Sequence, residues 1–168
     1  MGLRGSGKSA VGRLLAKQLK RPFVDLDARV LATFDEPTVT AVWSVLGEPA
    51  WRAAEASVLG ALLGQSAGVI ALGGGTPMID AARCDIEAAR VSGTATVIYL
   101  RCDAAELQRR LAAQTGDRPS LTGADPVQET TIVMQTREPV YRRLADHEYD
   151  VTATPLESVA EELRVLFE

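Results

Sequence analysis

A glycine-rich segment near the start of the chain has the strongest chemical signal in the sequence. Residues 2–9 read Gly-Leu-Arg-Gly-Ser-Gly-Lys-Ser and satisfy the pattern G-x-x-x-x-G-K-S/T. In such a loop the backbone N–H groups and the following helix N-terminus face a phosphate, and Lys8 reaches the outer phosphates as a point charge. Ser9 offers the kind of hydroxyl oxygen that Mg²⁺ binds. The segment therefore predicts a site for a nucleoside triphosphate with magnesium.

Two aspartates stand two positions apart where the next apolar run ends. Asp25 and Asp27 lie at the C-terminal end of a strand expected at 23–26, so both should point into the crevice where α/β sheets bind ligands. Paired carboxylates at that place suit Mg²⁺ and a substrate hydroxyl. The alternative is a helix N-cap at Asp27 beside one solvated aspartate.

Two further groups of residues could bind an acidic acceptor. Arg52 and Glu55 stand at i and i+3 on one expected helix, beside Trp51, and an ion pair would hold the guanidinium in a fixed direction. The alternative is a surface salt bridge. Glycines 73–75 follow the apolar run 69–72 and leave backbone N–H groups open to a ligand. The alternative there is a tight turn.

Two arginines in the last third of the chain, Arg118 and Arg137, are candidates for the site. Arg118 falls in a segment rich in Gly, Pro, Ser and Asp, residues 114–126, whose length predicts a lid. Arg137 falls in a long expected helix and is followed by Tyr141. Each arginine alone indicates little.

These residues need a scaffold that brings distant segments together, and the hydrophobic pattern predicts one. Helical periods alternate with short apolar runs, which is typical of an α/β fold with a doubly wound parallel sheet and helices on both faces. We expect helices at 11–19, 39–46, 48–63, 79–90, 103–113, 127–146 and after 155, and strands at 23–26, 68–72, 95–100 and 149–151. Capping boxes are predicted at Asp103 with Glu106 and at Thr154 with Glu157.

One element of that scaffold has no counterpart in the sequence. A phosphate-binding loop of this kind follows a buried strand, yet only Met1 precedes Gly2. Because that strand lies centrally in a doubly wound sheet, we expect unpaired backbone groups and a gap in the core. We also expect the true start of the protein to lie upstream.

Composition narrows the class of protein. A length of 168 residues, with 46% apolar and 24% charged residues, predicts one globular domain over residues 1–168. The net charge of −4 disfavours nucleic-acid and anionic-membrane partners. Residues 56–79 carry no charge, but glycines and Pro77 break the run, so no membrane span is expected.

The cysteines and the histidine exclude further classes. Cys84 and Cys102 form no C-x-x-C pair and no signal peptide is evident, so we expect a protein of the cytoplasm. His147 is the single histidine, which rules out sites that need several imidazoles and disfavours a Ser-His-Asp triad and a histidine-rich metal site.

Taken in order, these motifs resemble the shikimate kinase family from Gly2 onward. The matching segments are the loop at 2–9, Val24-Asp25-Leu26-Asp27, Gly47-Glu48-x-x-Trp51-Arg52-x-x-Glu55, Leu72-Gly73-Gly74-Gly75, Arg118-Pro119-x-Leu121 and Arg137-x-x-x-Tyr141. The resemblance implies a five-stranded parallel sheet. It also implies transfer of the γ-phosphoryl group of ATP to the 3-hydroxyl of shikimate, in the pathway to chorismate and the aromatic amino acids. A monomer that uses ATP and Mg²⁺ is expected.

The resemblance also implies roles for single residues. Asp27 would bind the substrate hydroxyls and act as base, Lys8 and Arg118 would meet the transferring phosphate, and Ser9 and Asp25 would hold Mg²⁺. The implied acceptor contacts are Asp27, Arg52, Gly74 and Arg137. The implied nucleotide contacts are Gly5, Ser6, Gly7, Lys8, Ser9, Ala10, Arg110 and Arg118.

Three departures and two competing functions accompany this interpretation. Trp51, Ala10 and Ser120 stand where the family usually has phenylalanine, threonine and leucine. Gluconate kinase shares the nucleotide half, and a non-catalytic nucleotide-binding protein is the alternative from a different class. Acceptor-dependent ADP release separates these functions.

Overall fold

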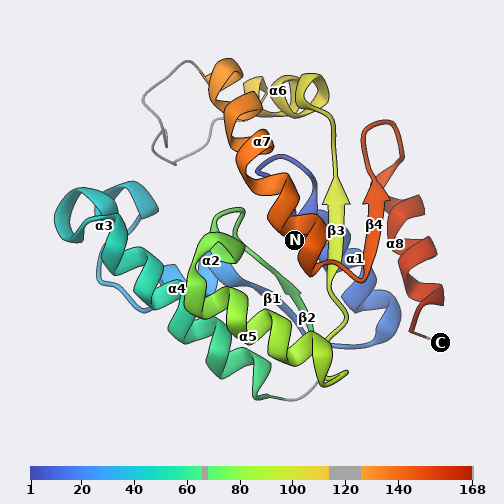
Figure 1. The fold of residues 1–168 in the computed structure, drawn as a ribbon, viewed down its shortest axis with the longest axis horizontal. Helices are drawn as coiled ribbons and strands as arrows, with labels where there is room; N and C mark the ends of the chain where they lie inside the picture. Colours follow the sequence, from blue (N-terminus) through green and yellow to red (C-terminus); the bar gives the residue numbers. More distant parts are fainter. Residues whose placement is uncertain (66–67, 114–125, 168) are drawn as a thin grey trace.

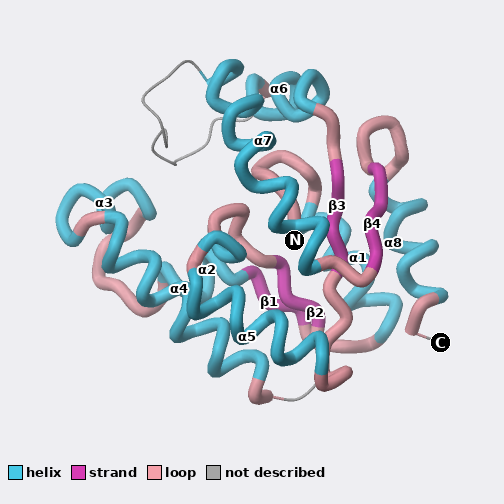
Figure 2. Tube along the Cα trace, in the orientation of Figure 1, coloured by secondary structure: helices cyan, strands magenta, loops and turns pink. Residues whose placement is uncertain are grey.

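Residues 1–65, 68–113 and 126–167 are described by a computed structural model in which four strands form two parallel pairs (Figure 1). Strand β1 (Phe23–Asp25) pairs with β2 (Val69–Ala71), and β3 (Ile98–Arg101) pairs with β4 (His147–Asp150). Figure 2 shows both pairs as short segments enclosed by helices. Parallel strands that alternate with helices are the predicted α/β arrangement, which is confirmed.

Helices precede, separate and follow the strands along the chain. They are α1 (Lys8–Leu19), α2 (Leu26–Leu31), α3 (Val39–Leu46), α4 (Glu48–Leu63), α5 (Asp80–Val91), α6 (Ala104–Ala112), α7 (Pro126–Leu144) and α8 (Leu156–Val165), with a 3₁₀ turn, η1, at Thr76–Met78. In Figure 1, α4 and α5 lie in front of β1 and β2, and α1 lies behind and packs on β2 and α8. Within the described ranges, no helix combines the length and the apolar composition that a bilayer crossing needs.

The predicted interruption of the sheet is present between β2 and β3, which belong to separate sheets. Met1 runs beside β3: its amino group donates to the Ile98 carbonyl at 2.6 Å, and the Leu100 N–H donates to the Met1 carbonyl at 2.9 Å. Met1 and Leu3 are buried, so their side chains fill part of the expected gap in the core. A start upstream of Met1 stays a prediction.

Two rings join the second strand pair to α7. Tyr99 of β3 and Tyr141 of α7 are 1% and 0% exposed, and their centroids lie 5.2 Å apart with an interplanar angle of 48°. Such tilted aromatic pairs add to the stabilisation that burial provides. Together they fix α7 against the sheet, and α7 is the helix that carries Arg137.

The predicted capping boxes are only partly correct. Asp103 caps α6 by accepting the Glu106 N–H at 2.8 Å, but the Glu106 carboxylate binds arginines instead of returning to the cap. Thr154 does not cap α8, because its hydroxyl donates to the Asp150 carbonyl, and α8 begins after Pro155 without a side-chain cap. Local sequence patterns could not show these competing partners.

Candidate active site

The glycine loop of residues 2–9 leads directly into α1, as predicted. Gly5 and Gly7 have φ values of 84° and 88°, a left-handed conformation that other residues rarely adopt, and Gly7 is the N-cap of α1. The Lys8 ammonium donates to the Leu3 carbonyl at 2.7 Å, so this side chain folds back over the loop. Ser6 is fully buried and Ala10 is exposed on the first turn of α1. The loop therefore presents a helix N-terminus and a lysine to one small region.

Ser9 and Asp25 are brought together from different elements. The Ser9 hydroxyl donates to Asp25 Oδ2 at 2.6 Å, and Asp25 Oδ1 accepts the Ala28 N–H at 3.3 Å. Asp25 is thus the N-cap of α2, a helix that the periodicity did not predict, and the alternative cap at Asp27 is wrong. The described residues contain no cluster of three or more His, Cys, Asp and Glu side chains that could hold a metal. One hydroxyl and one carboxylate fit Mg²⁺, which takes its other ligands from phosphates and water.

Asp27 lies in the first turn of α2, against the loop that follows β2. A methyl group placed on Gly73 would lie 2.5 Å from Asp27 Oδ1, 2.7 Å from Glu55 Oε1 and 2.9 Å from Thr76 Oγ1. Contacts this short are not tolerated in proteins. A glycine is therefore required at position 73 because three side-chain oxygens occupy the space that a side chain would need. This steric requirement is a more specific reason for glycine than the tight turn considered above.

Arg52 is held by two carboxylates of its own helix. Its Nε and Nη2 donate to Glu48 Oε1 at 2.9 and 2.8 Å, and its Nη1 donates to Glu55 Oε2 at 2.6 Å. Glu55 is 1% exposed and also accepts the Thr76 hydroxyl at 2.7 Å, so the surface salt bridge considered above is wrong. Burial alone would lower the pKa of Arg52, but the charges and hydrogen bonds of Glu55 and Glu48 outweigh burial and raise it.

The 73–75 loop contacts both the phosphate loop and the arginines proposed to bind the acceptor. Gly75 packs against the Arg52 guanidinium so closely that a methyl group there would overlap it. A methyl group on Gly74 would lie 3.4 Å from the Gly2 carbonyl oxygen, 3.5 Å from Arg137 Nη1 and 3.6 Å from the Arg4 amide nitrogen. Gly74 therefore lies between the phosphate loop and Arg137.

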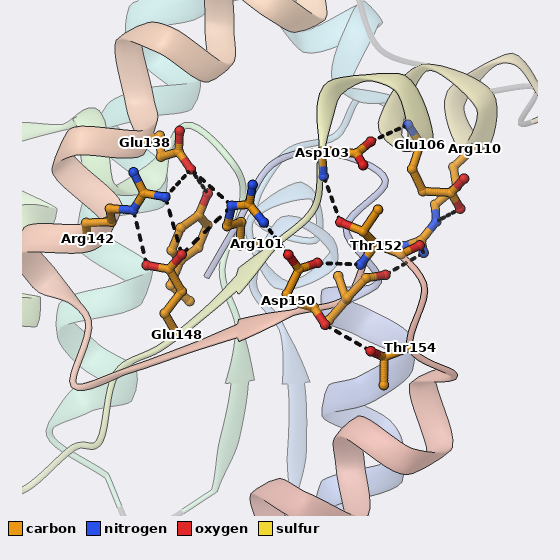
Figure 3. Close-up of polar contacts among 12 residues, drawn as sticks. Arg101, Asp103, Glu106, Arg110, Glu138, Arg142, Glu148, Asp150, Thr152 and Thr154 are labelled. Atoms are coloured by element: carbon orange, nitrogen blue, oxygen red, sulfur yellow. Dashed lines mark hydrogen bonds and ion pairs between the residues drawn. The ribbon is translucent and has the colours of Figure 1, made fainter.

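Arg110 connects α6 to two loops. It pairs with Glu106 at 2.7 Å and donates to the Val151 carbonyl at 2.7 Å and to the Gly5 carbonyl at 3.4 Å. Figure 3 shows Arg110 lying between Glu106 and the Thr152 segment. The contact with Gly5 places Arg110 at the phosphate loop.

Two predicted features lie outside the described residues. These are Arg118 and the lid at 114–126, of which only Pro126 falls within a described range as the first residue of α7. Their roles stay predictions.

Sequence reasoning assigned no role to three residues near the site. The aromatic ring over the Arg52 guanidinium is that of Trp43, whose centroid lies 5.5 Å from Arg52 Cζ. Trp51 is instead 2% exposed and stacks on Phe34. Thr76 was missed although it directly follows the three glycines. The Tyr141 hydroxyl donates to the Gly74 carbonyl at 2.5 Å, and its spacing of four from Arg137 was the available signal.

Comparison with known proteins identifies the family. The sequence profile of shikimate kinase matches residues 4–167, nearly the whole chain. The chain belongs to the shikimate kinase family. Its relatives include a shikimate kinase of Nitrobacter winogradskyi, 37% identical over 85% of this chain, and a shikimate kinase 2 of Sodalis glossinidius, 36% identical over 99%. This chain covers 64% of the Nitrobacter protein and 93% of the Sodalis protein.

Another family member, from Bradyrhizobium diazoefficiens, is 38% identical over 84% of this chain, which spans 65% of its length. The chain thus spans slightly less than two thirds of two of these relatives. Among solved structures, a shikimate kinase of Acinetobacter baumannii in complex with shikimate has a TM-score of 0.88 and 27% identity, covering 99% of this chain and 89% of that one. A shikimate kinase of Bacteroides thetaiotaomicron has a TM-score of 0.83 and 26% identity, covering 99% and 95%. The family fold is the predicted one.

Proposed function

We propose that the protein transfers the γ-phosphoryl group of ATP to the 3-hydroxyl of shikimate, giving shikimate 3-phosphate and ADP. One observation carries this proposal: Gly74 lies between the phosphate loop and Arg137, while its neighbours Gly73 and Gly75 lie against Asp27 and Arg52. A phosphate donor and an acidic, hydroxylated acceptor would therefore meet at one loop. The family of the chain and the shikimate bound to its Acinetobacter neighbour support shikimate as the acceptor.

On the nucleotide side, the backbone N–H groups of Gly5, Ser6 and Gly7 and the N-terminus of α1 would bind the phosphates. Lys8 would leave the Leu3 carbonyl and pair with the outer phosphates. Ser9 and Asp25 would hold Mg²⁺, which when bound neutralises phosphate charge. Ala10 follows on the first turn of α1, and Arg110 would border the base from the 151–152 loop.

On the acceptor side, Arg52 and Arg137 would bind the carboxylate of shikimate. The two glutamates that hold Arg52 fix the direction of its guanidinium before the substrate arrives, so less conformational entropy is lost on binding. Gly74 would lie under the ring because no side chain occupies that space.

The chemical step needs positioning and charge neutralisation more than covalent help. Asp27 would hydrogen-bond to the reacting hydroxyl and take its proton as the oxygen attacks the γ-phosphorus, while the bond from that phosphorus to the β,γ-bridging oxygen breaks. Arg118, from the predicted lid, would stabilise the transferring group and help exclude water.

The function is tested by ADP release from Mg·ATP with shikimate, with gluconate or with no acceptor. Release that depends on shikimate is expected. Release with gluconate would favour the alternative sugar-acid kinase, and nucleotide binding without acceptor-dependent release would favour a non-catalytic protein. Arg137→Ala should raise the KM for shikimate strongly and leave ATP binding nearly intact; an equal loss of ATP affinity would contradict its role in the acceptor clamp.

We propose further that residues 1–168 act as one kinase domain, as a monomer in the cytoplasm, with no nucleic-acid or membrane partner. Two free cysteines, Cys84 exposed and Cys102 buried, are compatible with a reducing compartment. Analytical ultracentrifugation at micromolar protein concentration tests whether the protein is a monomer.

A further inference from the structure

A chain of polar contacts runs from α7 to the 73–75 loop through one buried hydroxyl. Tyr141 is 0% exposed, and its hydroxyl donates to the Gly74 carbonyl at 2.5 Å. The Arg137 guanidinium lies beside the same loop, because its Nη1 is 3.5 Å from the point where a methyl carbon on Gly74 would stand, and its positive charge acts on the Tyr141 hydroxyl. The hydroxyl thus donates to the loop in the field of the guanidinium, and both neighbours belong to the proposed acceptor site.

The protonation state of Tyr141 suits this role. Burial raises the pKa of Tyr141 to about 12, although the charge and hydrogen bond of Arg137 oppose the shift. The phenol therefore keeps its proton at physiological pH. Only the protonated phenol can donate a hydrogen bond to the Gly74 carbonyl.

The backbone of α7 does not by itself fix this geometry. Pro139 lies inside the helix, between Arg137 and Tyr141. It has no N–H, so the helix lacks the backbone hydrogen bond that residue 139 would donate to the Gln135 carbonyl, in the turn that contains Arg137. A side-chain contact from the next turn supplies a restraint at that point.

The neighbouring side of α7 is tied to the second strand pair. Glu138 and Arg142 of α7 form ion pairs with each other and with residues of β3 and β4 (Figure 3). Arg142 pairs with Glu148 at 3.2 Å, and Glu138 lies 3.7 Å from Arg101. These contacts hold the helix to the sheet but do not touch the 73–75 loop, so Tyr141 is the contact of α7 that reaches the loop carbonyl.

We propose that Tyr141 is a positioning residue for acceptor binding, whose hydroxyl holds Arg137 and the Gly74 loop in one fixed arrangement. This inference rests on the proposed kinase function. Tyr141 touches neither phosphate nor base in this assignment. Loss of the Tyr141 hydroxyl should therefore weaken binding of the acceptor and leave binding of the nucleotide unchanged.

The ring pair supplies a matched control. Tyr99 packs against Tyr141 as a tilted ring pair and is 1% exposed, but its hydroxyl donates to Glu138 at 3.4 Å instead of to the loop. Tyr141→Phe and Tyr99→Phe each remove one buried hydroxyl from the same aromatic pair and keep both rings. A merely structural contribution would therefore lower the melting temperature in both variants without separating their kinetics.

The experiment measures KM for shikimate, KM for ATP, kcat and melting temperature for the wild type and both variants. In Tyr141→Phe we expect the KM for shikimate to rise roughly tenfold, since the variant leaves a buried carbonyl unpaired and Arg137 unrestrained. The KM for ATP should stay within twofold, and Tyr99→Phe should keep both constants. Equal KM changes in the two variants, or none in Tyr141→Phe, would overturn the inference.

A second readout needs no substrate. The amides of Thr76 and Met78 bond to the carbonyls of Gly73 and Gly75, so their hydrogen exchange reports opening of the loop. Exchange of these amides should quicken in Tyr141→Phe and not in Tyr99→Phe. If the wild type showed no shikimate-dependent ADP release, the proposed function would fail while this readout still decided the coupling; unchanged exchange in Tyr141→Phe would refute the coupling itself.

Discussion

Replacing Gly73 by alanine tests the acceptor site most directly, because three oxygens converge on that Cα. The added methyl carbon would lie 2.5 Å from Asp27 Oδ1, whereas ordinary contacts begin near 3.4 Å. The Glu55 carboxylate supplies the second of these oxygens; it is 1% exposed and accepts hydrogen bonds from Arg52 and Thr76, so it has little room to move. We therefore expect the Asp27 carboxylate to retreat by about 0.9 Å.

A displacement of this size is large for a group that must meet a reacting hydroxyl. A misplacement of about 1 Å lowers rates by roughly 10²-fold, and overpacking of this kind costs about 1–3 kcal/mol of folding stability. Gly73→Ala should thus lower kcat with shikimate about 100-fold and reduce the free energy of unfolding. The Kd for ATP should remain within twofold, because Asp27 lies on the acceptor side.

The assay is coupled ADP release, with ATP binding measured separately and unfolding followed in urea. Gly64→Ala is the matched control, because a methyl group there meets its nearest atom at 3.7 Å and Gly64 has an ordinary helical conformation. That variant should keep kcat. A Gly73→Ala enzyme with kcat within twofold of wild type would refute the steric argument and the role of Asp27 together.

Three further changes separate the two halves of the site. Arg52→Lys should raise the KM for shikimate roughly tenfold at unchanged KM for ATP, because an ammonium cannot satisfy both glutamates and a carboxylate in one plane; steady-state kinetics would contradict this if both constants moved together. Arg110→Ala should raise the KM for ATP several-fold and leave the KM for shikimate unchanged, because it removes the hydrogen bonds that Arg110 donates to the Gly5 and Val151 carbonyls. Equal changes in both KM values would argue against a role in nucleotide binding. Hydrogen bonds from Arg109 and Arg110 lower the pKa of Glu106 to about 2, so its stabilising contribution is present above its ordinary pKa near 4.5 and is lost as the pH falls towards 2. Urea unfolding of Glu106→Gln should therefore differ from wild type at pH 7 and converge with it below pH 4.5, and a difference that grew on acidification would be inconsistent with that shift.

The nucleotide half of the site could be predicted from sequence because its residues are adjacent in the chain. The loop at 2–9 needs only local glycine conformations and a helix start, and both are present. Arg52 with Glu55 was predictable for the same reason, since i and i+3 share a helix face. The spacing of these residues along the chain is enough to predict their contacts without the tertiary packing.

Contacts between distant segments could not be predicted in this way. The choice of Asp25 instead of Asp27 as the cap of α2 depends on where β1 ends, and periodicity places such ends only to within a few residues. The position of Trp43 over Arg52 depends on the angle between α3 and α4, and the bond from Tyr141 to Gly74 joins residues 67 positions apart. No pattern along the chain encodes such distances.

The Lys8 side chain bears on how tightly a nucleotide can bind. Its ammonium already donates to the Leu3 carbonyl of its own loop, so an arriving phosphate exchanges one hydrogen bond for another instead of adding one. Affinity gained from the lysine is the difference between an anionic and a neutral acceptor, which is smaller than the full ion pair. Release of ADP should be easier for the same reason, because the Lys8 ammonium can return to the Leu3 carbonyl when the phosphates leave.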